Sequence, residues 1–147
     1  MANSVRFGIY ALAIAGFTAI GAASALAQNA DEKKIIDDAK SVWGQCRACH
    51  QVGKTARNAV GPVLNGMMGR KSGEAKGYNY SAANKKSNLT WDDATFREYI
   101  KNPRKKIPGT KMAFAGIKGE TADKKIDALI AFLKLYDDKG MLPSERK

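Results

Sequence analysis

The sequence predicts a small all-α domain, and three observations support this prediction. Apolar residues recur with helical periodicity in three stretches, residues 31–50, 90–102 and 121–138. No stretch shows the alternation of apolar and polar residues that predicts a half-buried β-strand. The composition, 44% hydrophobic and 27% charged over 147 residues, is that of one globular domain and not of a disordered chain.

The first 27 residues are predicted to be a secretory signal peptide and not part of the fold. Arg6 is their only charged residue, an apolar run follows, and small residues end the segment at Ala27. The alternative is an uncleaved anchor, because residues 7–27 are 21 uncharged residues and a membrane span needs roughly 20. The small residues and the polar QNADEKK that follows favour cleavage. We therefore expect a single exported domain, residues 28–147, in the periplasm and without stable membrane insertion.

The exported domain is strongly basic. It has 24 Lys and Arg against 14 Asp and Glu once Arg6 is removed, so its net charge is +10. A surface of this sign attracts acidic partners at rates that salt lowers. Nucleic acid is excluded as a partner, because export separates the protein from it and no recognition motif accompanies the charge.

The first predicted helix spans residues 31–50. Its apolar positions Ile35, Ala39, Val42 and Cys46 form one stripe. The two cysteines of the chain therefore lie near the C-terminal end of this helix, three residues apart on one face.

Residues 53–89 show neither the helical periodicity of apolar residues nor the alternation that predicts a β-strand. The segment is 37 residues long and contains six glycines. A loop of this length inside a compact domain normally argues against the assignment. The loop can be ordered if a large apolar group other than protein fills the centre of the domain, and a covalently held macrocycle would be such a group.

The second predicted helix begins at the capping pattern Thr90-Trp-Asp-Asp93 and ends near Asn102, because Pro103 follows. Trp91 and Tyr99 lie on one line of this helix.

The third predicted helix runs from about residue 121 to residue 138, and Gly140 stops it. Its apolar face consists of Ile126, Leu129, Ile130, Leu133 and Tyr136. The tail LPSERK has nothing to bury, so we expect it to fray.

Both cysteines and the only histidine lie in one short stretch, GQCRACHQ, as Cys46, Cys49 and His50. C-x-x-C-H is the attachment signature of c-type haem, in which two thiols on one helical face reach two vinyl groups and the imidazole binds the iron. The sequence therefore predicts one covalently attached haem c.

Three alternatives to haem use the same residues. A dithiol oxidoreductase, the strongest of them, would need a βαβ frame that the chain does not show. A structural zinc site needs four ligands, and three are present. A disulfide between residues three apart is strained and closes a loop too small to stabilise much.

A haem iron in this chain needs a second axial ligand other than histidine, or it keeps an open position. The candidates in the exported domain are Met67, Met68, Met112 and Met141. Methionine is usually core filler. Met112, however, lies in IPGTKMAFAG between a Pro108-Gly109 turn and a bend at Gly116, so the loop can cross the far face of a ring and present one side chain.

Five segments in order, CRACHQV, GPVLNGMMGRKSG, GYNYSAANKKSNLTW, YIKNPRKKIPGTKMAFAGIK and ALIAFLKLY, resemble class I cytochromes c of the mitochondrial and bacterial cytochrome c2 type. The resemblance implies N- and C-terminal helices packed across one haem with glycine-rich loops around it. It implies thioether links at Cys46 and Cys49, and axial ligands His50 and Met112.

The resemblance also implies further contacts to the cofactor. The Pro62 carbonyl would accept the His50 ring N–H. Tyr99 would hydrogen-bond the Met112 sulfur, with Thr110 and Asn84 on the same side. Arg70, Tyr80 and Trp91 would hold a buried haem propionate, where an unpaired carboxylate is costly. Taken alone, each of these residues would have a structural duty.

The function implied is electron transfer and not catalysis. A monomeric periplasmic protein would carry one electron as Fe(III)/Fe(II) between acidic docking faces of membrane complexes, such as a bc1-type donor and a terminal oxidase or photosynthetic reaction centre. The candidate docking residues around the exposed haem edge are Lys54, Arg104, Lys105, Lys111, Phe114 and Lys118. A haem enzyme such as a peroxidase is the alternative, and it would require an open iron position.

Three positions depart from the family pattern. The family commonly has a glycine eight residues before the first cysteine and an aromatic residue four before it, where this chain has Asp38 and Val42, with Trp43 adjacent. Gln45 stands where a lysine often precedes the first cysteine. The first departure concerns how closely the first helix crosses the last.

Overall fold

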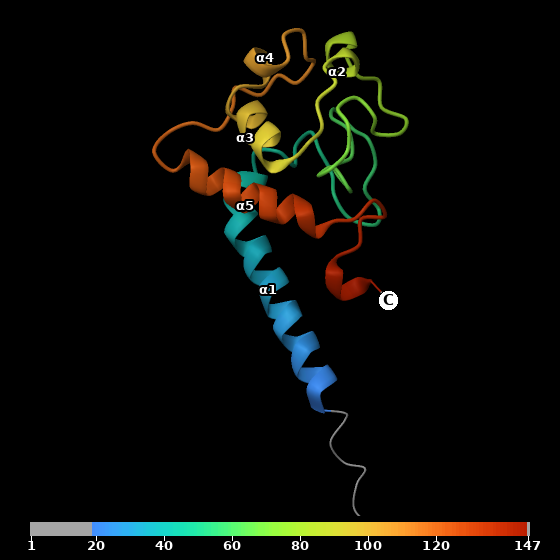
Figure 1. The fold of residues 1–147 in the computed structure, drawn as a ribbon, viewed down its shortest axis with the longest axis vertical. Helices are drawn as coiled ribbons and strands as arrows, with labels where there is room; N and C mark the ends of the chain where they lie inside the picture. Colours follow the sequence, from blue (N-terminus) through green and yellow to red (C-terminus); the bar gives the residue numbers. More distant parts are fainter. Residues whose placement is uncertain (1–18, 147) are drawn as a thin grey trace, which may run out of the picture.

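A computed structural model describes residues 19–146 of the chain as helices joined by ordered loops (Figure 1). The helices are α1 (Ala19–Trp43), α2 (Ala82–Lys86), α3 (Asp93–Lys101), α4 (Pro103–Lys106), α5 (Ala122–Leu135) and the 3₁₀ helix η1 (Pro143–Glu145). Within this range the only β-type pairing is an isolated antiparallel bridge between Lys71 and Thr90. The predicted all-α class is confirmed.

The predicted signal peptide falls largely outside the described residues. Residues 1–18 are not described, and residues 19–27 form the start of α1, which therefore begins earlier than expected from periodicity. Cleavage after Ala27 and the domain limits 28–147 remain predictions. Between residues 19 and 146, no helix is both long and apolar enough to cross a membrane.

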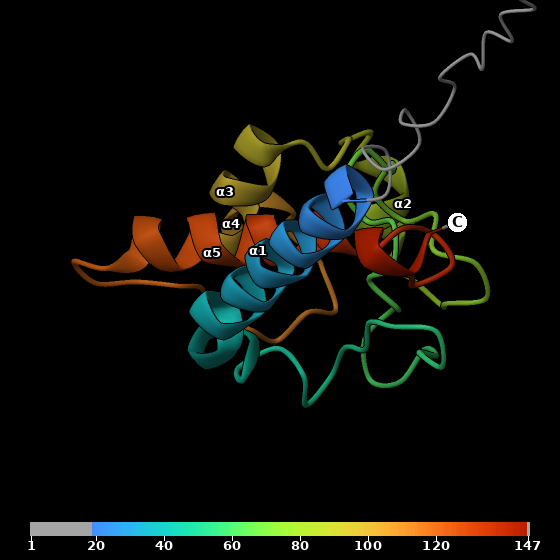
Figure 2. The same cartoon turned by 90° about the horizontal axis from the view of Figure 1, so that it is seen from below.

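The crossing of α1 and α5 is the main helix–helix contact of the fold (Figures 1 and 2). On α1, Ala39 and Val42 are 0% and 1% exposed. The ring of Trp43 packs against Phe132 of α5, with ring centroids 5.0 Å apart and planes inclined at 42°. This aromatic pair joins two helices whose contacting residues are 89 positions apart in the sequence.

The departure from the family pattern in α1 is a shift by one residue. The small residue at the buried position is Ala39 and the aromatic residue is Trp43, so both stand one position closer to Cys46 than the family spacing requires. Their separation of four residues is kept, which places them on one helix face. Asp38 stays exposed and pairs with Lys34 at 2.6 Å.

Ala39→Leu is expected to destabilise the haem-loaded protein by about 1–3 kcal/mol, because extra methylene groups at a fully buried site force the surrounding helices apart. Guanidinium denaturation would measure the loss. Ser41→Leu is the matched control, since Ser41 is exposed on the same helix. Equal stabilities for the two variants would contradict a close crossing at Ala39.

Two short helices were not predicted. α2 has five residues and α4 has four, which is too short for a stripe of apolar residues to be visible in sequence. Side-chain caps begin both helices: Ser81 Oγ accepts the Asn84 N–H at 3.0 Å, and Asn102 Oδ1 accepts the Lys105 N–H at 3.1 Å. The predicted end of the second helix is confirmed, since α3 ends at Lys101 and Pro103 opens α4.

The C-terminal tail does not fray as expected. It forms η1, which contacts α1 (Figure 1). The reason is polar and not apolar: the Glu32 carboxylate, 6% exposed on α1, accepts hydrogen bonds from the backbone N–H and the hydroxyl of Ser144, both at 2.6 Å.

Candidate functional site

A cavity of about 350 Å³ lies between α1, α3, α5 and the long loops. This volume is in the range of small-molecule and cofactor sites. Helices supply an apolar wall that includes Phe96, Ile100, Leu129 and Leu133. All eleven side chains predicted to contact the cofactor line this one cavity: Cys46, Cys49, His50, Pro62, Arg70, Tyr80, Asn84, Trp91, Tyr99, Thr110 and Met112.

The His50 ring is fixed from behind by the following loop. Its Nδ1 lies 2.8 Å from the Pro62 carbonyl oxygen, so Nδ1 carries the proton and donates it, and Nε2 keeps its lone pair. A Cβ added at Gly61 would lie 2.3–2.7 Å from three ring atoms, so only glycine leaves room for the ring. Burial lowers the pKa of His50, although the hydrogen bond to Pro62 opposes this shift.

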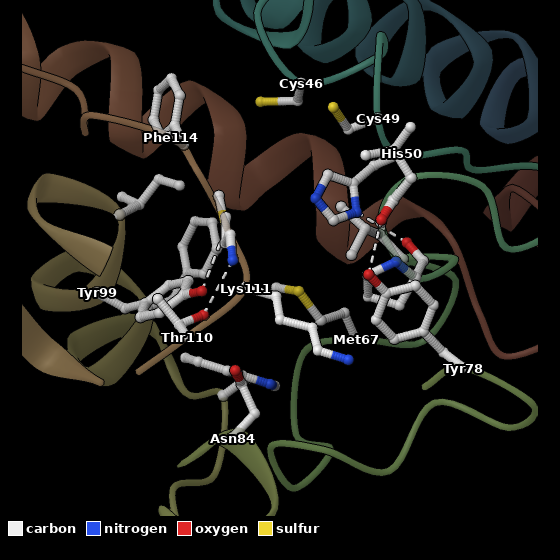
Figure 3. Close-up of a pocket in the computed structure, with 18 of the residues that line it drawn as sticks. Cys46, Cys49, His50, Met67, Tyr78, Asn84, Tyr99, Thr110, Lys111 and Phe114 are labelled. Carbon is white, nitrogen blue, oxygen red and sulfur yellow. Dashed lines mark hydrogen bonds between the residues drawn. The ribbon is translucent and has the colours of Figure 1, made fainter. Parts of the chain in front are cut away.

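The two cysteines lie in a turn that continues from α1 and not within the regular helix, which ends at Trp43. The N–H groups of Cys49 and His50 both donate to the Cys46 carbonyl at 3.0 Å, and these bonds keep the helical spacing of the thiols. Both cysteines are free and line the cavity beside His50 (Figure 3).

Burial, and secondarily the charge of Cys49, raises the pKa of the Cys46 thiol to about 11. Dithiol oxidoreductases depend on a lowered thiol pKa. The environment of Cys46 is therefore the opposite of what the dithiol alternative requires.

The opposite wall of the cavity presents Met112. The Tyr99 hydroxyl donates to the Met112 sulfur at 3.1 Å, and the Met112 N–H donates to Thr110 Oγ1 at 3.3 Å. Figure 3 shows Tyr99 and Thr110 across the cavity from His50. Burial raises the pKa of Tyr99, so its hydroxyl stays protonated and available as a donor.

Met67 is a second methionine in the cavity (Figure 3). It is 6% exposed, and among the hydrogen bonds of the described residues none reaches its sulfur. Met68 and Met141 do not line the cavity. Met112 is thus the cavity methionine whose sulfur is oriented by a donor.

Among the residues that the structure describes, the charged side chains lining the cavity are Arg70 and Lys111, and no carboxylate lines it. The Arg70 guanidinium donates to the carbonyls of Asn65 and Val63 at 2.9 and 3.3 Å, while its buried Nε has no partner among the described residues. A buried positive group without an anion is costly. The cavity therefore fits a large, mainly apolar group that brings its own negative charge to Arg70.

Several lining residues were missed in the sequence. Trp43, one turn before Cys46, and Gly61, directly before Pro62, were both detectable from their neighbours. Tyr78 also lines the cavity, and its hydroxyl donates to the Val60 carbonyl at 2.7 Å. Its position two residues before the predicted Tyr80 could have indicated this role. The two rings pack edge-on, with their centroids 4.8 Å apart.

The predicted docking residues come from several different elements. Lys111 and Phe114 line the cavity, whereas Arg104 and Lys105 lie on α4 and Lys118 lies in the loop before α5. Lys54 is held in an ion pair with Glu145 of the tail at 2.9 Å.

Comparisons with known proteins agree on one family. The family model "Cytochrome c" matches residues 33–135. A cytochrome c-550 of Bradyrhizobium diazoefficiens is 56% identical over 103 residues, which are 70% of this chain and 74% of that protein. A cytochrome c2 of Blastochloris viridis is 52% identical over 101 residues, 69% of this chain and 77% of that protein. The solved structure of cytochrome cH from Methylobacterium extorquens matches with a TM-score of 0.60 and 46% identity, over 67% of this chain and 95% of that one.

Proposed function

The chain belongs to the cytochrome c family, and from this premise we propose that it carries single electrons between membrane complexes of the periplasm, with His50 and Met112 as the axial ligands of its haem. As a member of this family it is an electron carrier and not an enzyme, and it binds one haem c through Cys46 and Cys49. The bound haem supplies a one-electron Fe(III)/Fe(II) couple.

One observation carries the proposal: two side chains that can bind a metal, His50 and Met112, line one cavity, and a hydrogen bond holds each of them. The hydrogen bond to Pro62 orients His50 Nε2, and the hydroxyl of Tyr99 orients the Met112 sulfur. Two fixed ligands leave no position for a substrate, which favours electron transfer over the peroxidase alternative.

The remaining cavity residues control charge and solvent. With haem bound, the apolar wall from α3 and α5 would exclude water from the ring, and Arg70 would compensate a buried carboxylate through its Nε. Tyr80 and Trp91 lie in the same cavity and would assist Arg70, as the resemblance implies.

We also propose that the mouth of the cavity meets acidic partners. Val60, at the cavity edge, is 75% exposed, and Lys111 lines the same cavity. Within residues 19–146, the carboxylates in ion pairs belong to α1, α3, α5 and the C-terminal tail, while Arg104, Lys105, Lys111 and Lys118 are in none. Such a distribution orients the protein toward a negative surface, such as that of a bc1-type donor, an oxidase or a reaction centre.

Absorption spectra and mass test the proposal together. The purified protein should be red, give a sharpened low-spin spectrum on adding dithionite, and have the mass of residues 28–147 plus one haem. A colourless protein with two titratable thiols would refute it. A high-spin spectrum would exclude Met112 as ligand and favour the peroxidase alternative.

Raising the salt concentration from 10 to 200 mM should slow reduction of the protein by an acidic redox partner by about tenfold, because screening removes long-range attraction. Stopped-flow mixing would measure the rate, with an uncharged reductant as the control that salt does not affect. A partner reaction that is equally fast at both concentrations would remove the docking role of the lysines.

Tyr99→Phe should lower the midpoint potential by about 20–60 mV, which is a net hydrogen bond of roughly 0.5–1.5 kcal/mol expressed for a one-electron couple. Without the hydroxyl, the Met112 sulfur donates more electron density and favours Fe(III). Redox titration would measure the change. Tyr136→Phe, which makes the same substitution away from Met112, should leave the potential unchanged; an equal shift in both variants would contradict the role of Tyr99.

A further inference from the structure

The C-terminal segment 136–146 is held at both ends, because it continues directly from α5 at its start and makes polar contacts at its far end. At the far end, Ser144 is held by Glu32 of α1 through two hydrogen bonds of 2.6 Å, and Glu145 pairs with Lys54 at 2.9 Å. The Arg146 guanidinium returns to the carbonyl of Leu135 at 2.6 Å.

Between these ends the segment is in close contact with the loop that follows His50. A Cβ added at Gly140 would lie 2.3 Å from the carbonyl group of Gly53 and 2.5 Å from the side-chain nitrogen of Asn65. The Gly66 N–H donates to the Tyr136 carbonyl at 3.1 Å. The two stretches are thus in backbone contact, although Gly66 and Tyr136 are 70 positions apart in the sequence.

Asn65 connects the contact to the cavity. Its buried side chain accepts the Gly53 N–H at 2.9 Å and donates to the Gly53 carbonyl at 3.0 Å, which closes the loop 53–65. Its carbonyl accepts the Arg70 guanidinium at 2.9 Å. The closed loop includes Pro62, which receives the His50 ring N–H.

We propose that the segment 136–146 is a brace for the His50 side of the cavity, and that Gly140 and Asn65 are positioning residues acting on His50 and Arg70. This inference rests on the proposed function, because positioning of His50 matters most if His50 binds the iron. The loop's own hydrogen bonds span few residues and would open locally, whereas the brace ties the loop to α1 and α5.

Gly140→Ala in the haem-loaded protein tests the brace, with Gly119→Ala as a matched control. Both glycines have positive φ, +75° and +93°, so both substitutions strain the backbone, but Gly119 has no atom within 4 Å of an added Cβ. In the Gly140 variant we expect amide hydrogen exchange of Gly61 and Leu64 to rise at least tenfold above the control. Amides of α3 should change equally in both variants.

The midpoint potential is the second readout, and it should move in the Gly140 variant only. If amide exchange in the Gly140 variant rose by the same factor in the loop and in α3, the segment would only stabilise the whole protein, and the proposal would be overturned. Equal loop exchange in the Gly140 and Gly119 variants would also overturn it. The exchange assay does not depend on the identity of the axial ligands. A spectrum showing that His50 does not bind the iron would therefore contradict the proposed function, while the exchange assay would still test the brace.

Ser144→Ala keeps the test available if the Gly140 variant does not fold. It removes one of the two hydrogen bonds to Glu32, and loop exchange should rise several-fold, whereas Ser144→Thr keeps the hydroxyl and should restore the original rate. Loop exchange that is identical in the alanine and threonine variants would overturn the link between the tail and the loop.

Discussion

Replacing Met112 by leucine should change the haem-loaded protein from low spin to high spin and lower its midpoint potential by about 0.2 V, a quarter of the roughly 0.8 V that axial ligands control. Leucine matches methionine in volume, so the apolar packing is nearly kept and the sulfur alone is lost. The thioether ligand favours the reduced iron in this family, and without it Fe(III) gains stability. Redox titration and the absorption spectrum of each state would measure both effects.

Met67→Leu is the control for this prediction. Met67 lines the same cavity and is more buried than Met112, but no hydrogen bond orients its sulfur within the described part of the chain. Its replacement should leave spin state and potential almost unaltered. The reverse outcome, a change of spin state in the Met67 variant and none in the Met112 variant, would move the ligand assignment to Met67.

Gly61→Ala should destabilise the protein by about 3 kcal/mol or more and disturb the His50 ligation. The new Cβ would lie 2.3–2.7 Å from three atoms of the imidazole, well inside van der Waals contact. The carbonyl of Pro62, the residue after Gly61, accepts a hydrogen bond from the ring. Neither the ring nor the loop can therefore move without breaking that bond. Overpacking of this kind at a fixed site is among the few causes of large losses. Guanidinium unfolding and the low-spin spectrum would report stability and ligation separately.

Val60→Ala serves as the control in the same loop. Val60 is 75% exposed, and trimming an exposed side chain usually changes stability by no more than about 0.5 kcal/mol. If Gly61→Ala proved as mild as Val60→Ala, the close contact between the loop and the His50 ring would be wrong.

The parts of the site that could be predicted are those with a fixed spacing in sequence. Cys46, Cys49 and His50 lie within five residues, so helical geometry alone places them on one side. Met112 is 62 residues after His50, and its selection from the methionines used two turns around it together with a family resemblance. The structure places Met67 in the same cavity, which no local pattern indicates, because loop 53–89 has no periodicity from which to read a direction.

The helices show the same division. Long stretches with apolar stripes, now α3 and α5, were found close to their true limits, while α2 and α4 were missed because four or five residues hold no full period. The order of the tail could not be predicted, since it depends on polar contacts with distant residues, among them the Glu32 carboxylate of α1, which lies 112 residues before Ser144. Pairs of polar residues so far apart leave no mark on the local sequence.

The cavity also sets the order in which this protein is made. The cavity of about 350 Å³ has an apolar wall from α3 and α5, and apolar interior that is left unfilled destabilises a folded chain. We therefore expect the native arrangement of α1, α3 and α5 to be stable only once the haem is in place. Haem attachment and folding would then be coupled, and we expect the thiols of Cys46 and Cys49 to stay accessible until the haem is bound.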